Sequence, residues 1–215
     1  MADVIVNILD PATSTDLISL DELKINLGLP SGASASDPQL SQAISYNSAT
    51  LAVLCNRVFA REKVEETWRW EGCECLGNPR IYLTHFPVVE ADIESVTTGG
   101  SLVDPSDYEL EEKSGKLRYL LGGWLDPTVI VYTGGYVLPD DAPPPLKQAA
   151  SILTRTAYFA SKFAALSMGG VRQLSHKHSR VSFFDPAQQV MMASGGPGAS
   201  QAVNSLISHF TRYNI

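Results

Sequence analysis

The apolar residues of this chain change their spacing twice, and this change constrains the fold more than any other feature. From about residue 19 to 59 they recur every three or four positions, as on one face of a helix. From 62 to 136 short alternating runs are separated by glycine turns, which is typical of antiparallel strands. Helical spacing returns from 145 to 167. The pattern predicts an α+β fold: a helical bundle with an inserted small antiparallel β region.

Two helices are predicted before the β region, joined by a short polar loop. Ser19 and Glu22 form a capping-box pattern that starts the first helix, and Gly28 ends it. Asp37 is expected to cap the second helix, which extends to about Phe59. The bundle would therefore open with a helical pair, followed much later by a long third helix and a short C-terminal helix.

The β region is predicted from alternation and turn residues. Val64, Glu66, Trp68 and Trp70 share one face of the first strand. Further strands are predicted at 80–83, 93–97, 108–111, 116–120 and 128–133. Three tryptophans, Trp124 included, could serve as interface anchors, but packing of the β region against the helices is favoured for them.

The C-terminal part combines helical signals with a segment rich in small residues. The helix at 145–167 has two apolar faces, so it is covered on more than one side, either by this chain or by a neighbouring copy. Residues 195–200 have the composition of a flexible linker. Val203, Leu206, Ile207 and Phe210 then follow helical spacing. This terminal helix is either a docking element or folds back on its own core.

The charge and cysteine content narrow the possible classes of function. The net charge of −7 argues against a protein that coats nucleic acid, since such binding draws on clustered lysine and arginine. It does not exclude a protein past which DNA moves without being held. Three scattered cysteines make no disulfide framework, and no signal peptide or stretch of about 20 apolar residues is visible.

No catalytic motif is found, and two clusters deserve comparison with metal sites. There is no Walker loop, nucleophile elbow or His-Glu-x-x-His motif. Cys73 and Cys75 are separated by one residue, whereas paired zinc thiolates normally have two between them and a second pair elsewhere. His176 and His178 lie in a basic segment, which is better read as a solvated strand or a surface for an acidic partner. We therefore expect no catalytic residue, metal or cofactor.

The order of these elements resembles the head–tail connector family of tailed bacteriophages, also called adaptor or head-completion proteins. The resemblance rests on several short stretches. Each stretch alone is a weak signal for the family, but their order and spacing together are more specific. They are 19–24 with 37–40, 87–88 with 93–96, 102 and 107–110, 129–136 with 138–139, 146–149, and 206–213. The loop at 71–79 and the glycine-rich segment at 195–200 depart from the family pattern.

The resemblance implies a structural, non-enzymatic protein of the virion neck that is made in the host cytoplasm. Subunits would form a ring, usually dodecameric, beneath the portal protein. The other face would receive further neck or tail proteins such as a stopper or tail terminator. Genomic DNA would pass through the lumen, and no membrane is involved. Residues 1–194 would form the connector domain, and 195–215 a linker with a docking helix.

Specific residues can be assigned to these expected contacts. Portal docking is expected of the terminal helix, through Val203, Leu206, Ile207, Phe210, Arg212 and Tyr213. Contacts between subunits are expected of apolar residues on the long helices, namely Leu51, Leu54, Ile152, Phe159 and Phe163. Two alternatives remain open. One is a tail-completion or other neck or tail protein, and the other is a metal-binding enzyme that uses the histidine and cysteine clusters.

Overall fold

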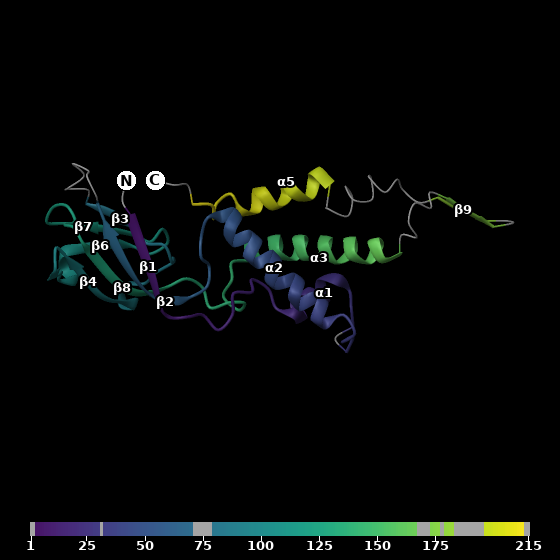
Figure 1. Cartoon of the computed structure of the whole chain (residues 1–215), viewed down its shortest axis with the longest axis horizontal. Helices are drawn as coiled ribbons and strands as arrows, with labels where there is room; N and C mark the ends of the chain where they lie inside the picture. Colours follow the sequence, from purple (N-terminus) through teal and green to yellow (C-terminus); the bar gives the residue numbers. More distant parts are fainter. Residues whose placement is uncertain are drawn as a thin grey trace. The chain divides into compact units, whose positions relative to one another are not determined.

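The computed structural model describes residues 3–30, 32–70, 79–166, 173–176, 179–182 and 196–212 (Figure 1). The chain divides into two compact units, and each is built from two separate segments. Met1–Thr15 and Arg57–Asp141 form the β unit, and Asp16–Asn56 and Ala142–Ile215 form the helical unit. The prediction of a connector domain ending at residue 194 stays a prediction.

The β unit contains a five-stranded antiparallel sheet with the order β1-β2-β8-β4-β5. Its strands are β1 (Asp3–Asp10), β2 (Glu62–Arg69), β8 (Thr128–Gly134), β4 (Ile93–Thr98) and β5 (Ser101–Leu102). Burial alternates along β2 and β8, so one face of each central strand points into the protein. The predicted shared face of Val64, Glu66 and Trp68 is therefore confirmed.

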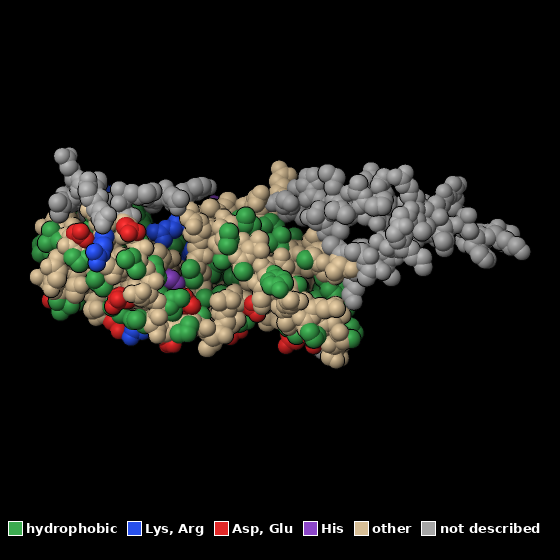
Figure 2. Space-filling model, in the orientation of Figure 1, with side chains coloured by type: hydrophobic (Ala, Val, Ile, Leu, Met, Phe, Trp, Pro, Cys, Tyr) green, Lys and Arg blue, Asp and Glu red, His purple; other side chains and the backbone are tan. Residues whose placement is uncertain are grey.

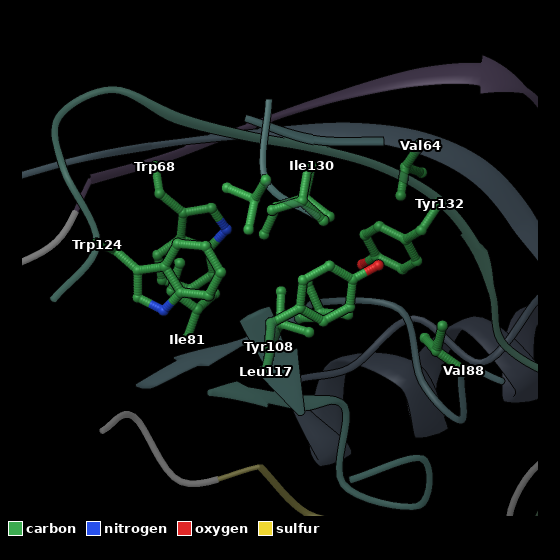
Figure 3. Packing of buried hydrophobic residues seen from close by; sticks show 12 residues of the cluster. Val64, Trp68, Ile81, Val88, Tyr108, Leu117, Trp124, Ile130 and Tyr132 are labelled. Atoms are coloured by element: carbon green, nitrogen blue, oxygen red, sulfur yellow. The ribbon is translucent and has the colours of Figure 1, made fainter. Parts of the chain in front are cut away.

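A second, three-stranded antiparallel sheet lies in the same unit, with the order β3-β7-β6. Its strands are β3 (Arg80–Tyr82), β7 (Lys116–Tyr119) and β6 (Tyr108–Glu111). Two short 3-10 helices, Glu90–Asp92 and Pro105–Asp107, precede β4 and β6. Residues from both sheets meet in one apolar core, which Figure 3 shows around Ile130 and Leu117. The β unit thus has a hydrophobic core of its own.

The helical unit begins with the predicted pair of helices, α1 (Leu20–Leu27) and α2 (Asp37–Cys55). The capping box is confirmed: the Glu22 amide donates to the Ser19 hydroxyl, and the Ser19 amide donates to the Glu22 carboxylate. Asp37, expected as the cap of α2, is instead its first helical residue and pairs with Lys24 at 2.8 Å. Because Asn56 adopts the left-handed conformation, α2 ends before the predicted Phe59.

Two more helices complete this unit, α3 (Pro144–Leu166) and α5 (Gly196–Ile207). Helix α5 begins inside the segment predicted as a glycine-rich linker. A helix can start there because Pro197 lies in the first turn, where the missing amide hydrogen would have no partner inside the helix.

Strands β9 (Gln173–His176) and β10 (Ser179–Ser182) form a separate two-stranded antiparallel sheet.

The predicted fold class is wrong. The structure is mostly β: the described residues of the β unit form eight strands in two antiparallel sheets, and the helices are not a bundle that receives a minor β insert. The prediction failed first at the N-terminus, where residues 3–10 form a strand of the larger sheet. Their apolar run has no clear period, so periodicity alone could not assign them. It failed again because spacing in one strand does not reveal that two sheets close over a common core.

Candidate assembly surfaces

Helix α2 presents an apolar stripe to solvent on the side opposite its core contacts. Tyr46 and Val53 lie seven residues apart, which places them on one face of a helix, and Leu54 follows about a quarter turn further round. Val53 is 79% exposed and Tyr46 is 65% exposed. Three exposed apolar side chains on one helix are a candidate contact surface. We name these three residues the α2 stripe.

The buried side of α2 explains where another predicted interface residue lies. Leu40, Ile44, Ser48, Leu51 and Cys55 are buried within the helical unit. Leu51, predicted as a subunit contact, is therefore a core residue, whereas the neighbouring Leu54 is half exposed. The sequence pattern had merged both sides of the helix because apolar residues occur on each of them.

Helix α3 contributes Phe159, which is 42% exposed and packs edge to face against Tyr158 with ring centroids 5.7 Å apart. Ile152 is only half-buried, so it also reaches the surface. The side chain of Phe163, the last predicted subunit contact, lies outside the described residues. Of the predicted subunit contacts, Leu54, Ile152 and Phe159 are therefore accessible to a neighbour.

The C-terminal helix α5 packs within the helical unit, against α3. Val203 and Ile207 are buried in this contact. Leu206, Phe210 and Arg212 are half-buried, and Tyr213 lies outside the described residues. The Arg212 amide donates a hydrogen bond to the carbonyl of Cys55 at the end of α2, at 2.8 Å. Two of the predicted docking residues thus belong to the core of their own unit.

The β unit also exposes apolar side chains that were not selected from the sequence. In β1, Ile5, Val6, Ile8 and Leu9 are exposed on both faces of the strand. Leu102 in β5, together with Leu120, Leu121 and Leu125, is exposed as well. Hydrophobic side chains reach the visible surface in many places (Figure 2). The run of β-branched and other apolar residues at 4–9 was the signal that could have found the first group, although it has no clear period.

The inside of the β unit holds a buried carboxylate that is fully engaged by hydrogen bonds. Glu66, in the middle of β2, is 0% exposed. It accepts hydrogen bonds from the Trp68 indole at 3.0 Å, from the amide and the hydroxyl of Thr84, and from the Tyr132 hydroxyl. Burial raises the pKa of Tyr132, and the Glu66 charge and hydrogen bond raise it further. The tyrosine therefore remains a protonated donor to the carboxylate.

A second acid–base pair continues this network. His85, which lies three residues after β3, is 3% exposed. Its Nδ1 lies 2.8 Å from the Thr84 hydroxyl, and its Nε2 lies 3.2 Å from Glu62. The other Glu62 oxygen accepts a hydrogen bond from the Ala12 amide at 3.2 Å. The network therefore joins four segments of the chain inside the β unit.

A surface cavity of about 310 Å³ lies at the end of the larger sheet. Its lining includes Asp10, Arg61 and Lys63. Both basic residues are already paired: Arg61 binds Asp92 at 2.8 Å, and Lys63 binds Glu94 at 2.6 Å. The cavity therefore lacks a free cation aimed at a ligand among its described lining residues.

Metal-binding chemistry finds no support in the described part of the chain. No group of three or more histidine, cysteine, aspartate or glutamate side chains suited to a metal ion occurs among those residues. Cys73, Cys75 and His178 lie outside them, and so does the side chain of His176. No helix among the described residues is long and apolar enough to cross a membrane.

The tryptophans serve the core of the β unit. Trp68 and Trp124 are buried, and Figure 3 shows both in the cluster between the sheets. The Trp124 indole donates to the carbonyl of Pro79 at 3.1 Å. Packing was the favoured interpretation of these residues, and the two buried tryptophans pack in the core between the two sheets of the β unit.

Comparison with known proteins identifies the fold. No protein-family model and no curated protein matches the sequence. A chain from the neck of an empty gene transfer agent particle, computed with C6 symmetry, aligns with a TM-score of 0.58 at 15% identity over 98% of this chain and 97% of that chain. A chain from the virion of a native gene transfer agent particle aligns over the same shares of both chains, with a TM-score of 0.56 at 16% identity. A chain from the neck of a native gene transfer agent particle, computed with C12 symmetry, aligns with a TM-score of 0.54 at 16% identity. At these identities the likeness establishes a shared fold over nearly the full length of both chains.

Proposed function

We propose that this chain is a structural subunit of the neck of a tailed-phage-like particle, where copies assemble into a ring between the portal and the tail. The observation that carries the proposal is the fold match to gene transfer agent neck and virion chains over 98% of this chain. Both units and their order are included in that match, so it does not depend on one common motif.

The proposed ring is supported by the symmetry of those necks and by the surface of the helices. The related necks were computed with C6 and C12 symmetry, as expected of cyclic assemblies. In this chain, the α2 stripe and Phe159 expose large apolar side chains of a kind that a neighbouring subunit would cover. We infer a dodecamer. The net charge of −7 would keep DNA from adhering to the lumen, because like charges repel.

Portal docking is proposed for the half-buried face of α5. Val203 and Ile207 hold the helix to its own unit, which leaves Leu206, Phe210 and Arg212 to meet the portal. The buried pair fixes the helix in place before docking, so less conformational entropy is lost on binding. The remaining neck contacts, to stopper or tail-terminator proteins, would use other surfaces of the ring.

Electron microscopy of the purified chain mixed with the portal of the same particle tests this function. We expect closed rings that sit coaxially on the portal. Chains that stay monomeric and bind no portal would refute the proposal. Binding to the tail tube without portal binding would replace it with a tail-completion role.

The subunit contact can be tested by placing a charge in the α2 stripe. Val53→Asp puts a carboxylate at the most exposed residue of the α2 stripe and is expected to reduce ring formation at least tenfold, because a buried unpaired charge is costly. Ser45→Asp adds the same charge on another exposed flank of α2 and serves as the control. Equal ring formation by both variants, measured by mass photometry, would exclude the stripe from the interface.

The docking face needs a test that leaves the helical unit folded. Removal of residues 195–215 would also remove Val203 and Ile207 from the core, so point variants are cleaner. The double variant Leu206→Ala with Phe210→Ala is expected to weaken portal binding at least tenfold. Asn204→Ala, at an exposed position of the same helix, is expected to bind normally. Undiminished binding by the double variant would remove α5 from the docking surface.

A further inference from the structure

Strand β1 has the features of an acceptor for an additional strand. It is the first strand of the larger sheet, and β2 is its only neighbour among the described residues. Ile8 is 55% exposed and Leu9 is 51% exposed, although they point to opposite faces of the sheet. A long apolar edge strand is a template for pairing with another chain, and proteins normally shield one. Among the described residues, no strand pairs with the outer edge of β1, and apolar side chains are exposed on both of its faces.

A matching donor occurs in the same sequence. Strands β9 and β10 pair with each other, with Leu174 opposite Val181, and with no other strand among the described residues. An isolated two-stranded sheet is at best marginally stable in water, and a third strand is normally needed. The β9–β10 ribbon therefore also has backbone edges to offer. Pairing with β1 would supply its missing strand.

The two elements carry opposite charges. Strand β1 has Asp3 and Asp10 at its ends and contains no basic residue. The segment 172–180 contains two arginines, one lysine and two histidines, and no acidic residue. Across the ladder, Arg69 lies opposite Asp3, whereas Lys63 opposite Asp10 is already paired with Glu94. The uncompensated carboxylate therefore lies at the Asp10 end of β1.

We propose that the β9–β10 ribbon of one copy adds to the open edge of β1 in a neighbouring copy, which extends the five-stranded sheet across the subunit boundary. Donor and acceptor are different surfaces of the chain, so the contact is heterologous. Heterologous contacts propagate around a ring and close it when the rotation permits. The main-chain hydrogen bonds of such strand addition give affinity, and the alternating apolar side chains give the register. This inference rests on the proposed ring function and specifies one of its contacts.

Disulfide trapping between two different copies tests the pairing directly. Cys73 and Cys75 are replaced by serine in all chains, while the fully buried Cys55 is kept. One preparation carries a single cysteine in β1, at Val6 or Ile8, and the other carries Val181→Cys. After mixing and mild oxidation, we expect disulfide heterodimers at a yield at least tenfold above a control in which Ile25→Cys, on the exposed face of α1, replaces the β1 variant.

The outcomes separate this contact from the ring function. Rings visible by microscopy with heterodimer yields equal to the Ile25→Cys control would overturn strand exchange and leave the neck function intact. Heterodimers without rings would support the contact and count against the neck function. A third outcome uses a chain that carries both cysteines. If this chain forms an internal disulfide at high dilution and the mixture of single-cysteine chains forms no heterodimers, the ribbon pairs with β1 of its own chain and the proposal is overturned.

A charge exchange provides a second, independent measurement. Arg180→Glu is expected to lower the heterodimer yield at least fivefold, because it brings a carboxylate toward the acidic end of β1. Adding Asp10→Lys to the acceptor chain is expected to recover most of that loss. A loss that Asp10→Lys does not recover would contradict this placement of the ribbon.

Discussion

Replacing Tyr132 by phenylalanine tests whether the buried network holds the larger sheet of the β unit to the segment that follows β3. The Tyr132 hydroxyl is fully buried, donates to the Glu66 carboxylate, and accepts a hydrogen bond from the His85 amide at 3.0 Å. Tyr132→Phe removes both bonds while it preserves the ring. A hydrogen bond to a charged group contributes about 1.5–3 kcal/mol, and a buried amide left without a partner costs about 1–3 kcal/mol. We expect the free energy of unfolding of the β unit to fall by about 3 kcal/mol.

The protein provides a convenient assay for this change. Trp68, Trp70 and Trp124 all belong to the β unit, so tryptophan fluorescence during urea unfolding reports on that unit. With an m-value of about 1.5 kcal/mol/M for a unit of this size, the urea midpoint should fall by about 2 M. Tyr46→Phe, at an exposed position of α2, is the control and should change stability by less than about 0.5 kcal/mol. A loss below about 0.5 kcal/mol for Tyr132→Phe would refute the reasoning.

Two further predictions concern the backbone at two glycines and the charge of Glu22 in the helical unit. Gly134→Ala would place a methyl group 2.3 Å from the carbonyl oxygen of His85, so we expect a loss of about 2 kcal/mol or more by urea unfolding. Gly28→Ala meets no atom within 4 Å and should lose only about 1 kcal/mol through its left-handed backbone. Burial alone would raise the pKa of Glu22, but hydrogen bonds and the charge of Lys147 lower it below 4.5. The stability that Glu22 provides is therefore present above pH 4.5 and is lost as the pH falls through its lowered pKa. Glu22→Gln should reduce the loss of helical stability in that acid range, measured by circular dichroism, and an unchanged acid profile would contradict this assignment.

Local signals in the sequence were enough to identify most of the individual elements. The capping box at Ser19 depends on residues three positions apart, and the structure has both of its hydrogen bonds. Strands β4, β6 and β8 follow alternating runs bounded by turn residues, and their predicted positions differ from the observed ones by at most one residue. Such signals succeed because capping and alternation are decided within a few residues of chain.

Only the tertiary structure decided which apolar residues are core and which are surface. Leu51 and Leu54 both fit the helical spacing of α2, yet one is buried and the other is half exposed. Val203 and Ile207 looked available for docking until α5 was found against α3. The Glu66–Tyr132 bond joins residues 66 positions apart. The sequence alone thus located most of the helices and strands, because those choices depend on near neighbours. The order of strands that leaves β1 at an open edge depends on contacts between distant segments, which no local pattern contains.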